Sequence, residues 1–298
     1  LATAAAMYKL SADEPLELSV GVDLAHDRRS APVLPHGSAG NWSQALRPVA
    51  ELQVPDPQVQ FLYEAAVRSL VLLSPQDVYP GPYTYKRFWF RDAALILHAM
   101  LAVGLLRRSE RVIEEFPPRQ HVSGFFCSQE GEWDSNGQVL WILHHFSRLA
   151  GRKLDEDQWY THVSRGAKWI KRKRRKTGKE AIHAGLLPAG FSAEHLGNND
   201  YYYWDDFWGV AGLYAAADLC EDWDRAGDAE QFRNEARRFM RDIERSLQRS
   251  RHIRNHPGIP ASPHRRMDAG AIGSIAVTYP LRLWEPRDPR VLGLLDYL

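Results

Sequence analysis

From Asp56 onward, the chain alternates between two kinds of hydrophobic pattern, both with a helical period. In the first kind, apolar residues recur every three or four positions and polar residues fill the gaps, which predicts a helix with one exposed face. Patterns of this kind cover residues 59–70, 159–170 and 232–247. In the second kind nearly every position is apolar, as in residues 93–106, 139–146, 210–219 and 269–277. Helices of the second kind must be covered on all sides.

The order of these helices, with a short polar helix expected near residues 109–116, predicts the fold class. A simple bundle would give every helix one polar face, and a solenoid would show a repeat of fixed length, which the chain lacks. Alternating half-exposed and fully covered helices are expected of two concentric rings. We therefore predict an all-α fold, an (α/α)6 toroid. Only about seven or eight of its twelve helices fit into the chain, so we expect the ring to be incomplete.

The first part of the chain has a different character. Residues 1–54 contain proline and glycine breaks and a single alternating stretch, residues 16–22, which predicts one strand. We expect residues 1–54 to be an irregular or β tail with a linker, and residues 55–298 to be the partial toroid. The sequence starts at Leu1 without a methionine and has no readable signal peptide. We interpret it as a fragment of open localisation, with the cytoplasm slightly favoured, and of open oligomeric state.

Composition narrows the classes of partner. Lys and Arg total 38 and Asp and Glu 37, so the net charge is +1, which argues against a nucleic-acid-binding protein. The longest apolar run, residues 93–106, is too short to span a membrane. Neither the 2 cysteines nor the scattered histidines have the spacing of metal ligands. We expect no metal and no cofactor.

Acidic residues and aromatic clusters mark the candidate chemistry. Aromatic residues gather in residues 79–90 and 201–208, as rings do in sugar-binding clefts, although packing of loops remains an alternative. Polar residues begin each apolar helix: Arg91 with Asp92, then Asp134, then Asp205 with Asp206, and finally Asp268. In a double ring these helix starts would open on one end and converge around a funnel. Simple capping of free N–H groups is the alternative for each residue.

Three segments with these residues resemble motifs of the six-hairpin glycosidases, the glucoamylase-like group in particular. Residues 88–94, Phe-Trp-Phe-Arg-Asp-Ala-Ala, are similar to its Trp-x-Arg-Asp-Ser/Ala motif. Residues 186–209 are similar to the loop that carries its general acid, and residues 132–137 to the subsite segment between the two. The resemblance covers residues 55–280, roughly the first two-thirds of such a catalytic domain.

The resemblance implies an inverting hydrolase of O-glycosides, of the α-glucoside type, whose substrate is an oligosaccharide or glycoside. Asp205 matches the general acid, and Asp206 is the second choice for that role or a substrate-binding carboxylate. The other implied substrate-binding residues are Trp89, Arg91, Asp92, Trp133, Asp134 and Trp204, with Trp133 and Trp204 as platforms for sugar rings.

A general acid must stay protonated near neutral pH, whereas a free Asp titrates at about 3.9. We expect the Trp204 ring and the neighbouring Asp206 charge to raise the pKa of Asp205. In the alternative, Asp205 and Asp206 only cap their helix.

The chain departs from the family pattern in two ways. It has two aspartates where the family has two glutamates, so the reach of the acid is one methylene shorter. The catalytic base of the family lies in later hairpins, and neither Glu194 nor Asp268, the possible partners, matches its motif. An inverting enzyme needs that second carboxylate at roughly 6.5–9.5 Å from the acid. We therefore expect half of a catalytic apparatus here.

Two other functions remain open: a glycoside phosphorylase on the same ring, and a non-catalytic carbohydrate-binding module. The basic run of residues 171–176 is best interpreted as a solvated helix end.

Overall fold

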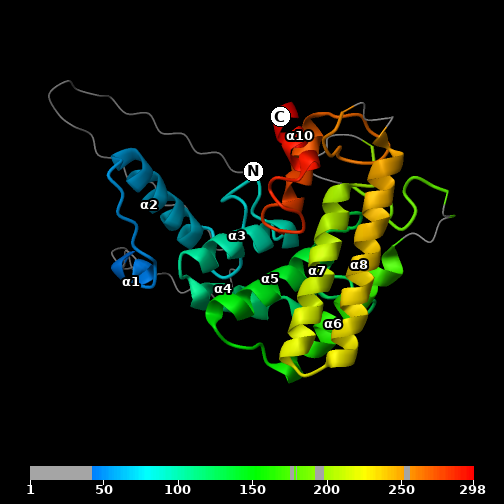
Figure 1. The fold of residues 1–298 in the computed structure, drawn as a ribbon. Helices are drawn as coiled ribbons and strands as arrows, with labels where there is room; N and C mark the ends of the chain where they lie inside the picture. The colour runs from blue at the N-terminus through cyan, green and yellow to red at the C-terminus, as the bar shows by residue number, and fades with distance from the viewer. Residues whose placement is uncertain (1–41, 175–177, 179, 192–197, 252–255) are drawn as a thin grey trace, which may run out of the picture. The chain divides into compact units, whose positions relative to one another are not determined.

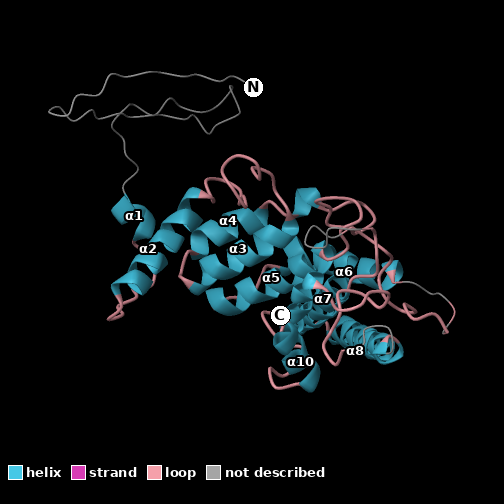
Figure 2. Cartoon of the chain, turned by 90° about the horizontal axis from the view of Figure 1, so that it is seen from above, coloured by secondary structure: helices cyan, strands magenta, loops and turns pink. Residues whose placement is uncertain are grey.

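The computed structural model describes residues 42–174, 178, 180–191, 198–251 and 256–298. In these residues the regular secondary structure is helical and includes no strand, which confirms the all-α prediction (Figure 1, Figure 2). The chain divides into two compact units, residues 1–45 and residues 46–298. Helix α1 (Trp42–Leu46) lies at their boundary, within the part predicted to be irregular. The strand predicted at residues 16–22 lies outside the described residues.

The helices of the second unit follow in the order α2 (Pro57–Leu72), α3 (Phe90–Ala102), α4 (Leu106–Glu114), η1 (Pro117–Arg119), α5 (Ser135–Ala150), α6 (Glu156–Lys173), α7 (Tyr203–Asp222), α8 (Ala226–Arg249), η2 (Ala269–Val277) and α10 (Pro289–Tyr297). Every helix predicted from the hydrophobic pattern has a counterpart in this series. The last apolar stretch, residues 269–277, forms a 3-10 helix, in which the backbone turns more tightly than in an α-helix.

Short-range signals set several of these boundaries. Asp56 caps α2 through its carboxylate, which accepts hydrogen bonds from the backbone N–H groups of Gln58 (2.8 Å) and Val59 (3.2 Å). Pro57 occupies the first helical position, where a missing N–H costs nothing. Gly151 ends α5 in a left-handed conformation with φ 65°, which glycine adopts without strain.

Replacing Asp56 by Ala is expected to lower the free energy of unfolding by about 1 kcal/mol, since two N–H groups of α2 lose their acceptor. Chemical denaturation measures this loss. Asp296→Ala, at an exposed position of α10, is the matched control and should change stability by less than about 0.5 kcal/mol. Equal losses in both variants would show that the cap contributes nothing specific.

The three apolar helices α3, α5 and α7 lie side by side and run parallel. At one end, Arg91 of α3 reaches Glu132 just before α5 (3.3 Å), and Trp204 of α7 reaches Asp134 (2.7 Å). Further along, His98 of α3 contacts His145 of α5 (2.9 Å). Nearly all of α7 is buried, as its apolar pattern predicts. The starts of all three helices therefore meet at the same end of this row.

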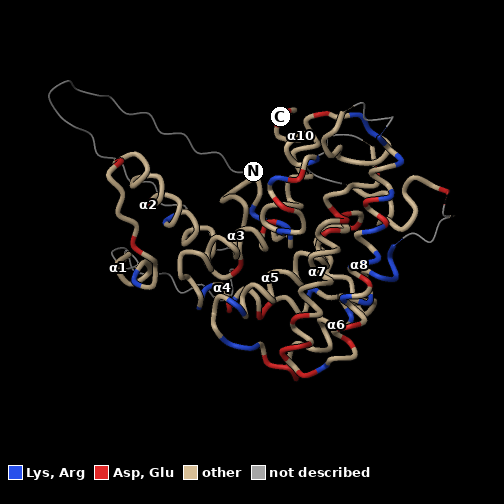
Figure 3. Tube along the Cα trace, viewed as in Figure 1, with Lys and Arg blue, Asp and Glu red and all other residues tan. Residues whose placement is uncertain are grey.

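The amphipathic helices α4, α6 and α8 connect the apolar ones and pack against them. Helix α8 returns antiparallel to α7: Tyr203 Oη and Ser246 Oγ lie 2.8 Å apart at one end, and Arg233 pairs with Asp218 (2.9 Å) at the other. Basic and acidic residues are interspersed along α8 (Figure 3). Phe239 and other apolar residues of this helix are buried. Each apolar helix is thus followed by an amphipathic partner.

Helices α5 and α7 approach closely because small residues lie where they cross. The side-chain position of Gly137 in α5 faces the backbone of Trp208, and that of Gly212 in α7 faces Gly137. A Cβ atom at either glycine would overlap backbone atoms of the other helix. This contact fixes the distance between the two helix starts that carry Asp134 and Asp205.

Candidate functional site

Two polar contacts join the starts of the three parallel helices. Arg91 Nη1 lies 3.3 Å from Glu132 Oε1, and Trp204 Nε1 donates a hydrogen bond to Asp134 Oδ2 (2.7 Å). Glu132 and Asp134 belong to the same short segment before α5, so the two contacts form one continuous chain. Residues more than a hundred positions apart in the sequence therefore gather in one place. We call this group, Arg91, Glu132, Asp134 and Trp204, together with Asp205, the residue that follows Trp204 in the chain, the acidic cluster.

The residues at the start of α3 are the most accessible part of the site. Arg91 Nη2 lies 3.5 Å from Asp92 Oδ2, and the Asp92 side chain keeps 26% of its surface exposed. Trp89 precedes the helix and is half-buried, with the guanidinium of Arg87 4.8 Å from its ring centre and Tyr85 beside it. These side chains combine hydrogen-bond donors, acceptors and an aromatic ring.

Asp134 lies deeper, with 3% of its surface exposed. Its Oδ2 accepts hydrogen bonds from Trp204 Nε1 (2.7 Å) and from Gln138 Nε2 (2.7 Å). The side chain makes no capping hydrogen bond to the backbone of α5. The capping alternative for Asp134 is therefore wrong, whereas Asp268 does cap η2 by accepting from Gly270 N (2.9 Å).

Trp133 is packed into the protein. It is 7% exposed, the ammonium of Lys173 lies 3.6 Å from its ring centre, and its Nε1 donates to the Ala189 carbonyl (3.4 Å). Phe125 and Trp169 lie beside it. The ring that the sequence suggested as a sugar platform is thus covered in this structure, because the end of α6 reaches over it. Trp204 is half-buried.

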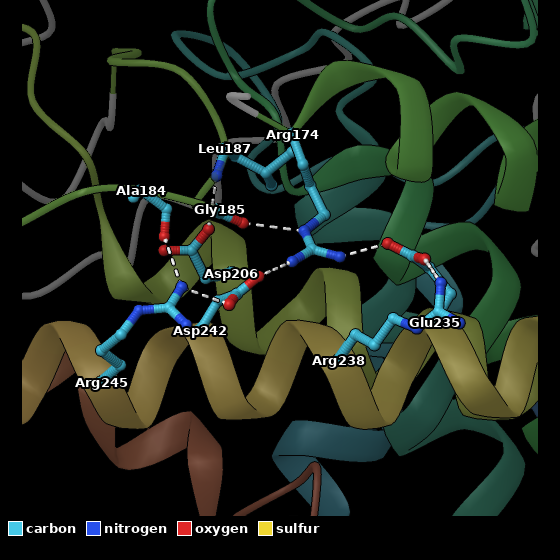
Figure 4. A network of polar contacts seen from close by, with 9 residues as sticks. All are labelled: Arg174, Ala184, Gly185, Leu187, Asp206, Glu235, Arg238, Asp242 and Arg245. Carbon is cyan, nitrogen blue, oxygen red and sulfur yellow. Dashed lines mark hydrogen bonds and ion pairs between the residues drawn. The ribbon is translucent and has the colours of Figure 1, made fainter. Parts of the chain in front are cut away.

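Asp205 and Asp206 both lie in the first turn of α7 and are buried, with 2% and 1% of their surfaces exposed. Successive residues on a helix point about 100° apart. Trp204 points toward α5, whereas Asp206 points toward α8, where its Oδ1 accepts a hydrogen bond from Leu187 N (2.9 Å) (Figure 4). Asp206 therefore lies away from the acidic cluster, and it does not cap α7.

The Asp206 carboxyl has a raised pKa. Burial raises the pKa of its carboxyl to about 8, and the nearby Asp242 adds to the rise, while the Leu187 N–H and the Arg174 charge oppose it. Its Oδ2 is buried and has no hydrogen-bond partner in the described part of the chain. The sequence predicts a raised pKa for the neighbouring Asp205, which is also buried.

Titration of Asp206 should make the stability of the fold depend on pH. Because its pKa is raised from the unfolded value of about 3.9, the native state loses stability as pH rises between that value and about 8. In Asp206→Asn, which imitates the protonated carboxyl, this loss should disappear. Between pH 5 and pH 8, the free energy of unfolding of the wild type should fall relative to the variant by more than about 1.4 kcal/mol. Parallel curves from urea denaturation would contradict the raised pKa.

The sequence offers Asp268 and Glu194 as possible partners of the acid. Asp268 caps η2 and pairs with Arg265 (3.2 Å), and its charge acts on the pKa of the Tyr202 hydroxyl, as that of Asp205 does. Asp268 therefore lies near the acidic cluster, but it is engaged as a helix cap. Glu194 lies outside the described residues.

The structure adds residues to this region that have no role in the sequence prediction. Glu132 is 4% exposed and pairs with Arg91, whereas the sequence marks it only as a member of the motif at residues 132–137. The place of this glutamate two positions before Asp134 is a signal in the sequence, and so is that of Gln138, one helical turn after Asp134. Arg174 and Leu187 give no such signal, because their partners come from distant parts of the sequence.

Other features of the described residues set the site apart. A cavity of about 590 Å³ lies between α4 and the far end of α5, lined by Arg107, Glu110, Phe146 and Arg152 among others, and is separate from the acidic cluster. No group of three or more His, Cys, Asp or Glu side chains that could hold a metal occurs in the part of the chain that the structure covers. Within the same residues, none of the helices has both the length and the apolar character needed to cross a membrane.

Comparisons with protein-family models and with curated proteins find no match for this chain.

Proposed function

We propose that the acidic cluster is the sugar-binding and acid-donating half of a glycoside hydrolase site, within consecutive hairpins of an (α/α)6 toroid. The arrangement of helices supports the fold proposal. Apolar helices α3, α5 and α7 lie parallel in one row, and each is followed by an amphipathic helix that packs against it. Concentric rings of helices have this order.

The convergence of Arg91, Asp134 and Trp204 at the starts of three parallel helices is the observation that carries the proposal. A sugar presents hydroxyl groups, which both donate and accept hydrogen bonds, and apolar ring faces. Arginine and carboxylate side chains bind the hydroxyls with fixed geometry, and indole rings pack against the apolar faces. Trp89, Asp92 and Trp204 are the exposed or half-exposed members of this set.

In the proposed reaction Asp205 donates its proton to the glycosidic oxygen as the bond to the anomeric carbon breaks. A second carboxylate removes a proton from the water that attacks the opposite face, so the configuration inverts. Burial of Asp205 at 2% exposure favours its protonated form, as a general acid requires. The resemblance to the glucoamylase-like group assigns the base to later hairpins.

The test is to incubate the full-length protein with α-linked gluco-oligosaccharides and follow the anomers by NMR. Release of β-glucose as the first product, independent of phosphate, is the expected result. Release of a sugar phosphate only when phosphate is present would instead favour a glycoside phosphorylase. Binding of the sugar without release would favour a carbohydrate-binding module. If the protein neither binds nor cleaves the sugar, the proposal is overturned.

A further inference from the structure

Residues 184–190 form a strap between the acidic cluster and the outer helices. Leu187 N donates to Asp206 Oδ1 (2.9 Å) in the first turn of α7. Two residues later, the Ala189 carbonyl accepts a hydrogen bond from Trp133 Nε1 (3.4 Å). The strap thus contacts α7 beside Asp205 and the segment before α5 beside Asp134. The strap therefore links the start of α7 to the segment before α5.

Arg174, at the end of α6, holds the strap from behind. Its Nε donates to the Gly185 carbonyl (2.8 Å), and its two terminal nitrogens pair with Glu235 and Asp242 of α8 (Figure 4). The guanidinium lies 4.2 Å from the ring centre of Phe239, and only 9% of the side chain is exposed. The prediction of a solvated helix end for the basic run is therefore wrong at this residue, because Arg174 pairs with the buried Glu235 and the half-buried Asp242.

A second arginine completes the arrangement. Arg245 Nη2 donates to the Ala184 carbonyl (3.3 Å) and also pairs with Asp242. Gly185 has φ 85°, and a Cβ atom at this position would overlap the carboxylate of Asp242. The strap is therefore held by two consecutive carbonyls and packed directly against α8. We call Arg174, Glu235, Asp242 and Arg245 the clamp.

The clamp is balanced in charge, with two arginines and two carboxylates. Asp206 is a further carboxyl next to it, and burial together with the nearby Asp242 raises its pKa. The chemistry of the clamp needs arginine at position 174, because one planar group donates in three directions and stacks on a ring. A lysine has the charge but not this geometry.

We propose that Arg174 is a positioning residue of the acidic cluster: through the strap and Asp206 it holds the first turn of α7 so that Trp204 faces Asp134. The part of this inference that concerns catalysis rests on the proposed function. The part that concerns geometry does not, because the Trp204–Asp134 hydrogen bond reports it directly.

The experiment follows indole N–H resonances by NMR in Arg174→Gln. The Trp204 signal, assigned with Trp204→Phe, should shift and exchange with solvent at least about tenfold faster. The Trp223 indole donates to the Leu154 carbonyl (2.7 Å) at the far end of α7 and should be unaffected. Arg238→Gln is the matched control, since Arg238 reaches the same Glu235 from solvent at 4.0 Å with 64% of its side chain exposed. It should leave both signals unchanged.

Kinetics on the same variants separate positioning from general stability. For Arg174→Gln, kcat for glycoside hydrolysis should fall about 10- to 100-fold while KM changes less than about threefold, because misplacement of a reacting group acts on the chemical step. An unchanged Trp204 signal, equal changes at Trp204 and Trp223, or an unchanged kcat beside a displaced Trp204 would overturn the inference. If the wild type hydrolyses no glycoside, the proposed function fails, and the indole signals still decide whether Arg174 positions α7.

Discussion

Asp205→Asn is expected to lower kcat for glycoside hydrolysis about 10²- to 10⁴-fold, the usual contribution of a general acid. The amide has the shape of the protonated carboxyl but cannot release a proton to the glycosidic oxygen. Sugar affinity should change little, because Arg91, Asp92 and Trp204 remain. The measurement is steady-state kinetics of the full-length protein, with affinity determined separately by calorimetry.

The leaving group gives this prediction a sharper form. A substrate whose leaving group is a stable phenolate needs little protonation, so its hydrolysis should be far less sensitive to Asp205→Asn than that of an oligosaccharide. Asp218→Asn is the matched control: it makes the same change in α7, at the distant end that pairs with Arg233, and should leave kcat unaltered. Full activity of Asp205→Asn on oligosaccharides would exclude Asp205 as the acid.

Gly137→Val should destabilise the fold by about 3 kcal/mol, near the upper end of the cost of overpacking a core. The valine side chain would have to occupy space filled by the backbone of Trp208, which forces α5 and α7 apart. Chemical denaturation measures the loss. The variant should also lose sugar binding, since Asp134 and Trp204 lie on the two helices that separate.

Gly227→Ala provides the comparison for this substitution. Gly227 lies in the first turn of α8, and nothing is within 4 Å of the position where its Cβ would be. Alanine there should be neutral or stabilise the helix by up to about 1 kcal/mol. Similar destabilisation at both glycines would mean that the α5–α7 crossing is not tightly packed.

Periodicity was enough to predict the helices, because the apolar residues of a buried helix face recur at a fixed spacing within one stretch of sequence. The alternation of apolar and amphipathic stretches also placed the starts of α3, α5 and α7 correctly at one end. The 3-10 geometry of η2 was not predictable in the same way: residues 269–277 are apolar throughout, and no local signal distinguishes the two kinds of helix there.

The site was predictable only in part. Arg91, Asp134 and Trp204 stand at helix starts. In the structure Trp204 contacts Asp134, and Arg91 contacts Glu132 in the same segment. A raised pKa is predicted for Asp205 from the sequence. The structure shows one at Asp206, whose neighbours Leu187, Arg174 and Asp242 come from other parts of the sequence. Arg174 was read as a surface residue because its partners, Glu235 and Asp242, lie some sixty positions away in the sequence and become neighbours only when α8 folds back.

The parallel row of α3, α5 and α7 has an electrostatic consequence. Each helix has a macrodipole equivalent to roughly half a positive charge at its N-terminus, and three such ends meet beside the acidic cluster. The backbone itself therefore adds to Arg91 in compensating the negative charge of Glu132 and Asp134. The same field favours ionised carboxylates, so the proposed role of Asp205 as an acid depends on its burial outweighing that field.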